Sequence, residues 1–145
     1  MINFQKKRLL PMIALMAVIS CKPKETQLLS TKDGLVGSWK LKMQGEDVNK
    51  NGKFDTEEKN QVSDSVQYSY QFMKDGKGYR VGNNSSFIDS LTWELVNNDA
   101  SIAIKLWNKG FKYNQTYDFE TGTKTLILKD KTLSPTYFYY FDREN

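Results

Sequence analysis

The stretch LTWELVNNDASIAIKLW, residues 91–107, decides the fold that the sequence predicts. Apolar and polar residues alternate strictly along residues 91–95, and the same alternation returns along residues 102–106. Period-two alternation is typical of a β-strand with one buried face. The turn-forming residues NNDA, at 97–100, separate the two runs. The stretch therefore predicts two antiparallel strands joined by a tight turn.

The same alternation recurs on both sides of this hairpin, with short turns such as KDGKG, residues 74–78, between the runs. Together with the hairpin, the expected strands are 39–43, 66–72, 79–81, 87–96, 101–107, 113–119, 125–129 and 137–141. No segment of comparable length shows the 3.6-residue period of a helix. About eight antiparallel strands in sequence order predict an all-β protein, a small up-and-down barrel whose closure removes exposed edges. A two-sheet sandwich is the alternative architecture.

The first twenty residues have the layout of a secretory signal. Three basic residues at positions 6–8 precede an apolar run, Leu9 to Ile19, which is too short to span a bilayer as a permanent helix. The ending VISC, residues 18–21, resembles the lipobox of bacterial lipoproteins. The resemblance implies cleavage before Cys21, a diacylglyceryl group on its thiol and an acyl chain, such as palmitate, on the new amino terminus. An ordinary signal with a chance cysteine is the alternative.

The expected organisation is a signal peptide at 1–20, lipidated Cys21 with a polar tether at 21–33, and a barrel domain at 34–145. The lipobox implies a bacterial cell-envelope protein, anchored to the outer membrane at its periplasmic or surface face. Three of the 21 basic residues belong to the first twenty, which leaves 18 against 17 acidic residues after cleavage. This nearly neutral balance indicates no nucleic-acid partner.

Histidine is absent from the sequence, which excludes histidine-dependent triads and imidazole metal ligands. A hydrolase that uses two carboxylates would need them to face each other across a cleft. The acids at Glu94, Asp118 and Glu120 instead alternate with apolar residues in an outward register. We expect the chain not to be an enzyme.

The stretch DVNKNGKFDTEE, residues 47–58, resembles the calcium loop of EF-hands. Its candidate ligands, at loop positions 1, 3, 5, 7, 9 and 12, are Asp47, Asn49, Asn51, Lys53 (through its backbone carbonyl), Asp55 and Glu58. Gly52 permits the sharp turn, and we expect Phe54 to pin the loop to the core. Because strands rather than helices flank it, the predicted cofactor is one structural calcium ion. A solvated turn, in which Asn and Asp bond their own backbone, is the alternative.

The stretch LVGSWKL, residues 35–41, resembles the Gly-x-Trp motif on the first strand of lipocalins and of bacterial lipocalin-like lipoproteins. The resemblance implies that Trp39 closes the barrel floor and that Arg143, near the last strand, caps it. It also implies that the calcium loop, between the first two strands, lies at the open end of the barrel.

Aromatic residues are abundant, since the chain has 3 Trp, 8 Tyr and 8 Phe. The candidates to line a pocket for an apolar ligand are Tyr68, Tyr70, Trp93, Tyr117, Tyr139 and Phe141. Alternatively these side chains fill a small barrel themselves. The expected partners are membrane lipid, through acylated Cys21, and a small apolar ligand or an envelope protein. A structural or accessory lipoprotein without a ligand is the alternative function.

Overall fold

The computed structural model describes residues 32–145. The predicted signal peptide, Cys21 and all but the last two residues of the predicted tether lie outside the described residues. The elements in chain order are α1 Lys32–Leu35, β1 Gly37–Glu46, η1 Thr56–Glu58, β2 Asn60–Gln61, β3 Tyr68–Phe72, β4 Lys77–Gly82, η2 Asn83–Ser85, β5 Ile88–Val96, β6 Ser101–Asn108, β7 Phe111–Thr121, β8 Thr125–Asp130 and β9 Tyr137–Arg143. Helices η1 and η2 are single 3-10 turns. None of the helices in this part of the chain is long and apolar enough to cross a membrane.

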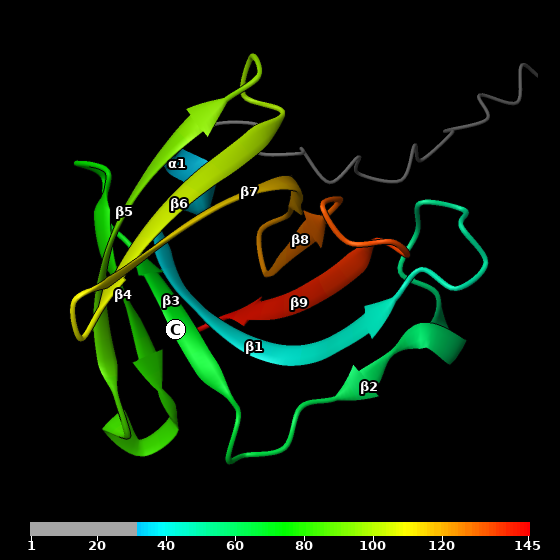
Figure 1. Ribbon diagram of the computed structural model, residues 1–145, viewed down its shortest axis with the longest axis horizontal. Coiled ribbons are helices and arrows are strands. Elements are labelled where there is room, and N and C mark those ends of the chain that lie inside the picture. The colour runs from blue at the N-terminus through cyan, green and yellow to red at the C-terminus, as the bar shows by residue number, and fades with distance from the viewer. Residues whose placement is uncertain (1–31) are drawn as a thin grey trace, which may run out of the picture.

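The strands form a closed antiparallel barrel (Figure 1). From β3 to β9 each strand pairs with the next one along the chain. Strand β1 pairs with β3 on one side and with β9 on the other, which closes the barrel with eight strands. The two-residue strand β2 is an addition beside β1. The predicted barrel is therefore confirmed, and the sandwich alternative is wrong.

The hairpin that decided the prediction is present as β5 and β6, paired from Ser90 with Trp107 to Val96 with Ser101. Its turn residues Asn97, Asn98 and Asp99 all have positive φ, a conformation that Asn and Asp tolerate better than other side chains. The strand expected from residue 66 begins only at Tyr68. Val66 lies in a turn, where its N–H donates to the Ser63 carbonyl, and its side chain is 58% exposed. The apolar alternation therefore predicted a strand that begins two residues too early.

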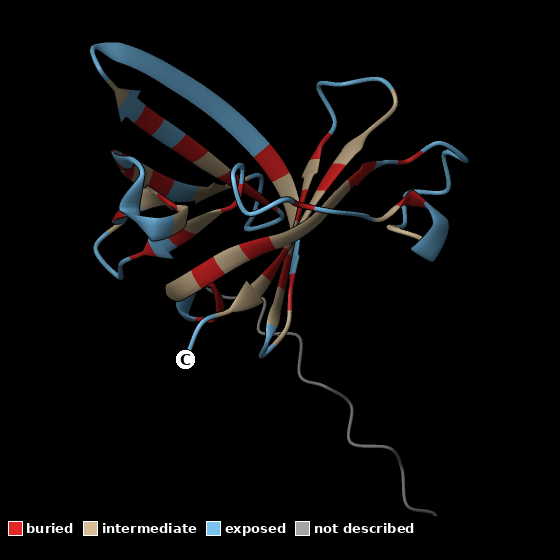
Figure 2. Ribbon diagram, turned by 90° about the horizontal axis from the view of Figure 1, so that it is seen from below, coloured by how far each residue is buried: buried red, intermediate tan, exposed pale blue. Residues whose placement is uncertain are grey.

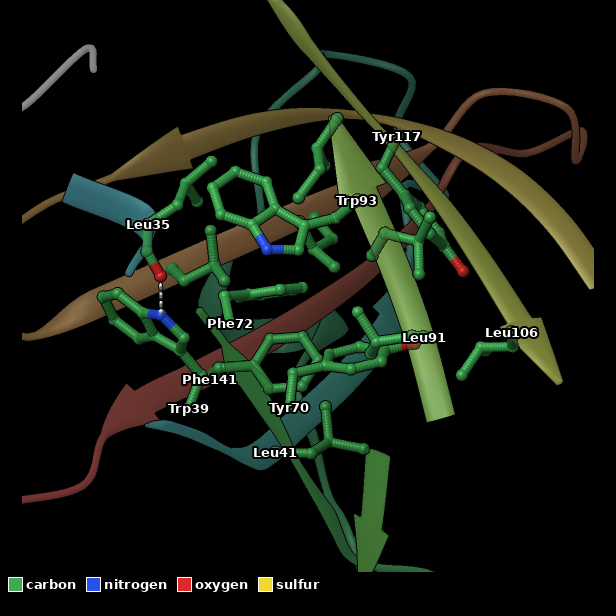
Figure 3. Close-up of a cluster of buried hydrophobic side chains, with 14 of the residues drawn as sticks. Leu35, Trp39, Leu41, Tyr70, Phe72, Leu91, Trp93, Leu106, Tyr117 and Phe141 are labelled. Carbon is green, nitrogen blue, oxygen red and sulfur yellow. Dashed lines mark hydrogen bonds between the residues drawn. The ribbon is translucent and has the colours of Figure 1, made fainter. Parts of the chain in front are cut away.

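The barrel interior holds one cluster of buried apolar side chains, most of which Figure 3 draws. At its floor Trp39 is fully buried and its indole N–H donates to the Leu35 carbonyl at 2.8 Å. The Arg143 guanidinium lies over the indole and donates to the carbonyls of Gly34 and Val36 at 2.6 and 3.0 Å. The expected placement of Arg143 beside Trp39 is therefore confirmed.

Candidate metal centre

The loop of residues 47–58 connects β1 with β2 and projects from the barrel (Figure 1). It begins where the Asp47 N–H donates to the Thr136 carbonyl at 2.9 Å, beside the turn between β8 and β9. It ends in η1, which is the only helical turn next to it within residues 32–145. A strand and a 3-10 turn thus take the places that two long helices hold in a calcium-sensing hand.

Alternate side chains in the first half of the loop turn toward the loop's own interior. The Asp47 carboxylate accepts hydrogen bonds from the backbone N–H of Asn51 at 3.0 Å and of Gly52 at 2.9 Å. The Asn49 side-chain oxygen accepts from Asn51 N–H at 3.0 Å, and the Asn51 oxygen from Lys53 N–H at 2.7 Å. Oxygens at loop positions 1, 3 and 5 therefore lie on the inner side of one curled segment, with Lys50 and Gly52 in the left-handed conformation that the curl requires.

The second half of the loop reaches back to the first. The Glu58 carboxylate accepts from the backbone N–H of Asn49 at 3.2 Å and of Asp55 at 3.3 Å. The Asp55 carboxylate accepts from the side-chain amides of Asn49 at 2.9 Å and Asn51 at 2.6 Å. These hydrogen bonds, that from Asn49 first, lower the pKa of Asp55, and Lys53 and Lys59 add a smaller effect. The structure thus brings the predicted ligand residues together in one hydrogen-bonded network.

Two carboxylates of this network are buried without an ion-pair partner. Asp47 is 5% exposed and Glu58 is 8% exposed, and neither forms an ion pair with any residue of the described part of the chain. Burying a carboxylate costs free energy unless hydrogen bonds and an opposite charge offset the loss of water. Backbone N–H groups supply the hydrogen bonds here, and no Lys or Arg within residues 32–145 forms an ion pair with either carboxylate.

The donor set is mixed in its chemistry. No group of three or more His, Cys, Asp or Glu side chains within residues 32–145 is arranged to hold a metal ion. A site in this loop therefore also needs the amide oxygens of Asn49 and Asn51 and the carbonyl of Lys53, all of them the hard oxygen ligands that calcium takes. The same hydrogen bonds also fit the alternative of a self-bonded turn.

The loop is fastened to the outside of the barrel. The Phe54 ring stacks on Phe138 with 5.3 Å between centroids and 26° between planes, and the Lys129 ammonium donates to the Gly52 carbonyl at 3.2 Å. A Cβ on Gly45 would stand 1.8 Å from the Glu58 carbonyl oxygen, so only glycine allows this close approach. Phe138 is fully buried but does not belong to the interior cluster. The expectation that Phe54 pins the loop to the core is corrected accordingly, because Phe54 covers the outer face of β9.

The six aromatic residues predicted to line a pocket all belong to the interior cluster or pack against it. Tyr70, Trp93, Tyr117 and Phe141 are at most 4% exposed, and Tyr68 and Tyr139 are partly buried. Tyr70 lies 5.3 Å from Tyr68 and 5.6 Å from Phe141, and Tyr117 lies 6.0 Å from Tyr139, all between ring centroids. Burial raises the pKa of Tyr70 to about 12. This packing is what the filled-barrel alternative expects.

Sequence reasoning missed an ion pair inside the barrel. Arg80 on β4 donates through Nε at 3.0 Å and Nη2 at 2.6 Å to one oxygen of Asp89 on β5, and Asp89 is 4% exposed. The central carbon of the guanidinium lies 5.7 Å from the ring centroid of Tyr68 and 5.2 Å from that of Phe87. Asp89 stands two residues before inward-facing Leu91, so the alternation of the strand already placed its side chain on the inner face. This spacing could have indicated a buried charge that needs a partner. A cavity of about 480 Å³ lies beside Arg80, lined partly by strands β6 and β7.

The three carboxylates considered for acid–base chemistry each pair with a lysine. The pairs are Glu94 with Lys105, Asp118 with Lys131, and Glu120 with Lys129. Hydrogen bonds from Lys131 and then Ser101 lower the pKa of Asp118. Their surroundings are therefore those of solvated ion pairs on the barrel wall.

Comparison with protein-family models, with curated proteins and with solved structures found no match to this chain. The three resemblances, to lipoproteins, to lipocalins and to EF-hand loops, accordingly rest on the residues of the chain itself.

Proposed function

We propose that this chain is a lipid-anchored protein of the bacterial cell envelope, with a lipocalin-like barrel that binds one structural calcium ion at residues 47–58. The barrel serves as a binding domain for a small apolar molecule or a neighbouring envelope protein. One observation carries the calcium proposal. The loop gathers the side chains of its alternate residues, and two of its carboxylates are buried without an ion-pair partner within the described residues.

Calcium would be held by oxygens of six residues, the side chains of Asp47, Asn49, Asn51, Asp55 and Glu58 and the carbonyl of Lys53. The ion would give both buried carboxylates an opposite charge in direct contact. The loop contacts β1 through Gly45 and β9 through Phe138, so the ion would fasten the connection between two neighbouring barrel strands. Calcium binding would therefore stabilise one end of the barrel, whereas in a calcium-sensing EF-hand it changes the angle between two helices.

The test is thermal unfolding of the full chain with calcium and with a chelator. Extracellular calcium modules bind with a Kd of about 10⁻⁴–10⁻³ M, so calcium at about 100 times Kd stabilises by about 2.7 kcal/mol. We expect calcium to raise the Tm and Glu58→Gln to abolish the rise. Glu57→Gln is the matched control, because Glu57 is the exposed neighbour in η1 and is not at a ligand position. A Tm that is the same with calcium and with the chelator contradicts the proposal.

The membrane anchor is supported by the VISC ending and the polar residues that follow it. A lipid-modified amino terminus carrying several acyl chains anchors a protein stably, since each buried methylene contributes about 0.8 kcal/mol. We expect the wild-type chain in the membrane fraction and the Cys21→Ser variant in the soluble fraction. Membrane association that survives Cys21→Ser contradicts the lipid anchor and leaves the calcium proposal intact.

A structural or accessory lipoprotein is the second candidate, and the packing of the aromatic interior favours it. The two candidates differ in whether the barrel takes up an apolar molecule. Binding of 1-anilinonaphthalene-8-sulfonate to the folded protein, weakened by Tyr117→Ala, supports the ligand-binding function. An absence of binding to the folded protein supports the structural one.

A further inference from the structure

Strand β7 carries an unpaired edge at the open end of the barrel. Residues Phe111–Asp118 pair with β6 over their whole length. Strand β8 meets β7 only from Asp118 to Thr121, where Asp118 lies opposite Lys129. Within residues 32–145 no strand pairs with the other side of residues 111–117, which we call the β7 edge.

The β7 edge is exposed along nearly all of its length. Every residue from 111 to 116 is exposed, with Phe111 at 67% and Tyr113 at 51%. Figure 2 shows this half of β7 as a continuous pale-blue band on the hairpin that it forms with β6. Along an unpaired edge, alternate residues direct backbone N–H and C=O groups outward, and these groups form a template for another strand.

The β7 edge has few of the features that normally prevent an unpaired strand from pairing with another chain. Proteins block edges with proline, bulges, several charges or a covering element. The β7 edge, FKYNQTY, has no proline and a single charged residue, Lys112, and its register with β6 is continuous. An edge with two exposed aromatic rings and one charge is suited to pairing.

We propose that the β7 edge is a dimerisation surface, at which two copies of this chain pair edge to edge as antiparallel strands around a twofold axis at Asn114. Self-complementarity of the edge argues for a second copy. In this register Lys112 faces Thr116, Tyr113 faces Gln115, and Phe111 faces Tyr117. No like charges meet in this register, which favours cross-strand pairing. Closed twofold pairing of identical edges leaves no further edge for growth.

The pairing also completes the barrel wall. The cavity of about 480 Å³ beside Arg80 is lined by Lys112, Tyr113, Asn114 and Gln115 of the β7 edge. A partner strand beside the edge would cover this side of the cavity. The inference is independent of calcium and of any ligand, so its failure leaves the proposed function unaffected.

The test is disulfide trapping of the full chain in membranes and in mild detergent. Opposed residues of an antiparallel pair have Cβ atoms about 4.5–5.5 Å apart, close to what a disulfide needs. We expect Asn114→Cys to give a covalent dimer under mild oxidation. Lys112→Cys alone should not, because the two introduced thiols would lie four residues, about 13 Å, apart along the strands. The double variant Lys112→Cys/Thr116→Cys should cross-link again. The controls are the wild-type chain, with Cys21 alone, and Asn98→Cys at an exposed turn on β5–β6.

Charge substitutions test the same register without cysteine. Tyr113→Lys/Gln115→Lys places introduced lysines opposite one another at two points of the dimer, so we expect at least a tenfold weaker dimer in analytical ultracentrifugation. Tyr113→Lys/Gln115→Glu places opposite charges there and should retain it. Both residues are exposed, but Gln115 accepts a hydrogen bond from the Tyr117 hydroxyl, so circular dichroism must show that both variants are folded. A monomer at all concentrations, a dimer that Asn114→Cys cross-links no faster than Asn98→Cys, or cross-linking of position 114 to a different protein overturns the proposal.

Discussion

The guanidinium of Arg143 lies over the indole of Trp39 with 4.2 Å between its central carbon and the ring centroid. Two of its nitrogens bond the carbonyls of Gly34 and Val36, while the buried Nε has no partner within the described residues. Arg143 is on the last strand, and Trp39 is opposite it on the first. One side chain therefore joins the closing strand pair to the segment that leads into the barrel.

Replacing Arg143 by lysine should lower the free energy of unfolding by about 2 kcal/mol, because lysine cannot reach two carbonyls in a fixed fork or stack flat on an indole. Urea unfolding followed by tryptophan fluorescence measures the change. Lys124→Ala, at the exposed turn before β8, is the control and should change stability by less than about 0.5 kcal/mol. Equal effects of the two variants would show that the floor contact contributes no stability.

Replacing Gly45 by alanine should displace the calcium loop. The added methyl group would stand 1.8 Å from the Glu58 carbonyl oxygen and 3.0 Å from the Phe54 ring, so η1 must move away from β1. We expect a loss of about 1–3 kcal/mol in stability, as for other overpacked sites, and a weaker calcium response. Gly122→Ala is the matched control, since its nearest contact is at 3.2 Å from a side-chain oxygen. A Gly45→Ala variant with wild-type stability and calcium response would contradict the contact.

Removing the charge of Asp89 should destabilise the barrel because Arg80 would lose its partner inside it. We expect Asp89→Asn to cost about 2 kcal/mol, less than a fully buried pair, since the Arg80 side chain is 25% exposed. Glu94→Gln, in the exposed pair with Lys105, is the control and should cost less than about 1 kcal/mol. Chemical denaturation of both variants measures the difference, and an Asp89→Asn variant as stable as Glu94→Gln refutes a structural role for the interior pair.

Alkaline pH should unfold the barrel through its buried tyrosines. Burial raises the pKa of Tyr70 to about 12 and also raises that of Tyr117. A folded pKa above the unfolded value of about 10 means that the unfolded state loses its proton first, so stability is full below pH 10 and falls as pH rises from 10 toward 12. Absorbance at 295 nm and circular dichroism should show a late ionisation phase that coincides with unfolding. Ionisation of all tyrosines in one step near pH 10, with the fold intact, would contradict the burial.

The strands could be predicted because their alternation is local, and the closed barrel followed from their number and short turns. What could not be predicted depends on register between distant residues. The unpaired half of β7 exists because β8 stops at Asp130, which no local pattern in FKYNQTY records. Likewise Arg80 and Asp89 meet only because β4 and β5 pair in one particular register.

The loop at 47–58 curls as its spacing predicts, because Asn and Asp bond neighbouring backbone within a few residues. The contact of Phe54 with Phe138 depended on where the loop lies, which the spacing does not specify.

Calorimetric titration of the folded protein with calcium tests most directly whether residues 47–58 form a metal site. We predict one binding event per chain with a Kd of about 10⁻⁴–10⁻³ M, lost in Glu58→Gln, retained in Glu57→Gln, and much weaker for magnesium, which demands stricter octahedral geometry. No calcium binding at millimolar concentrations, or equal binding by the Glu58→Gln variant, would contradict the account.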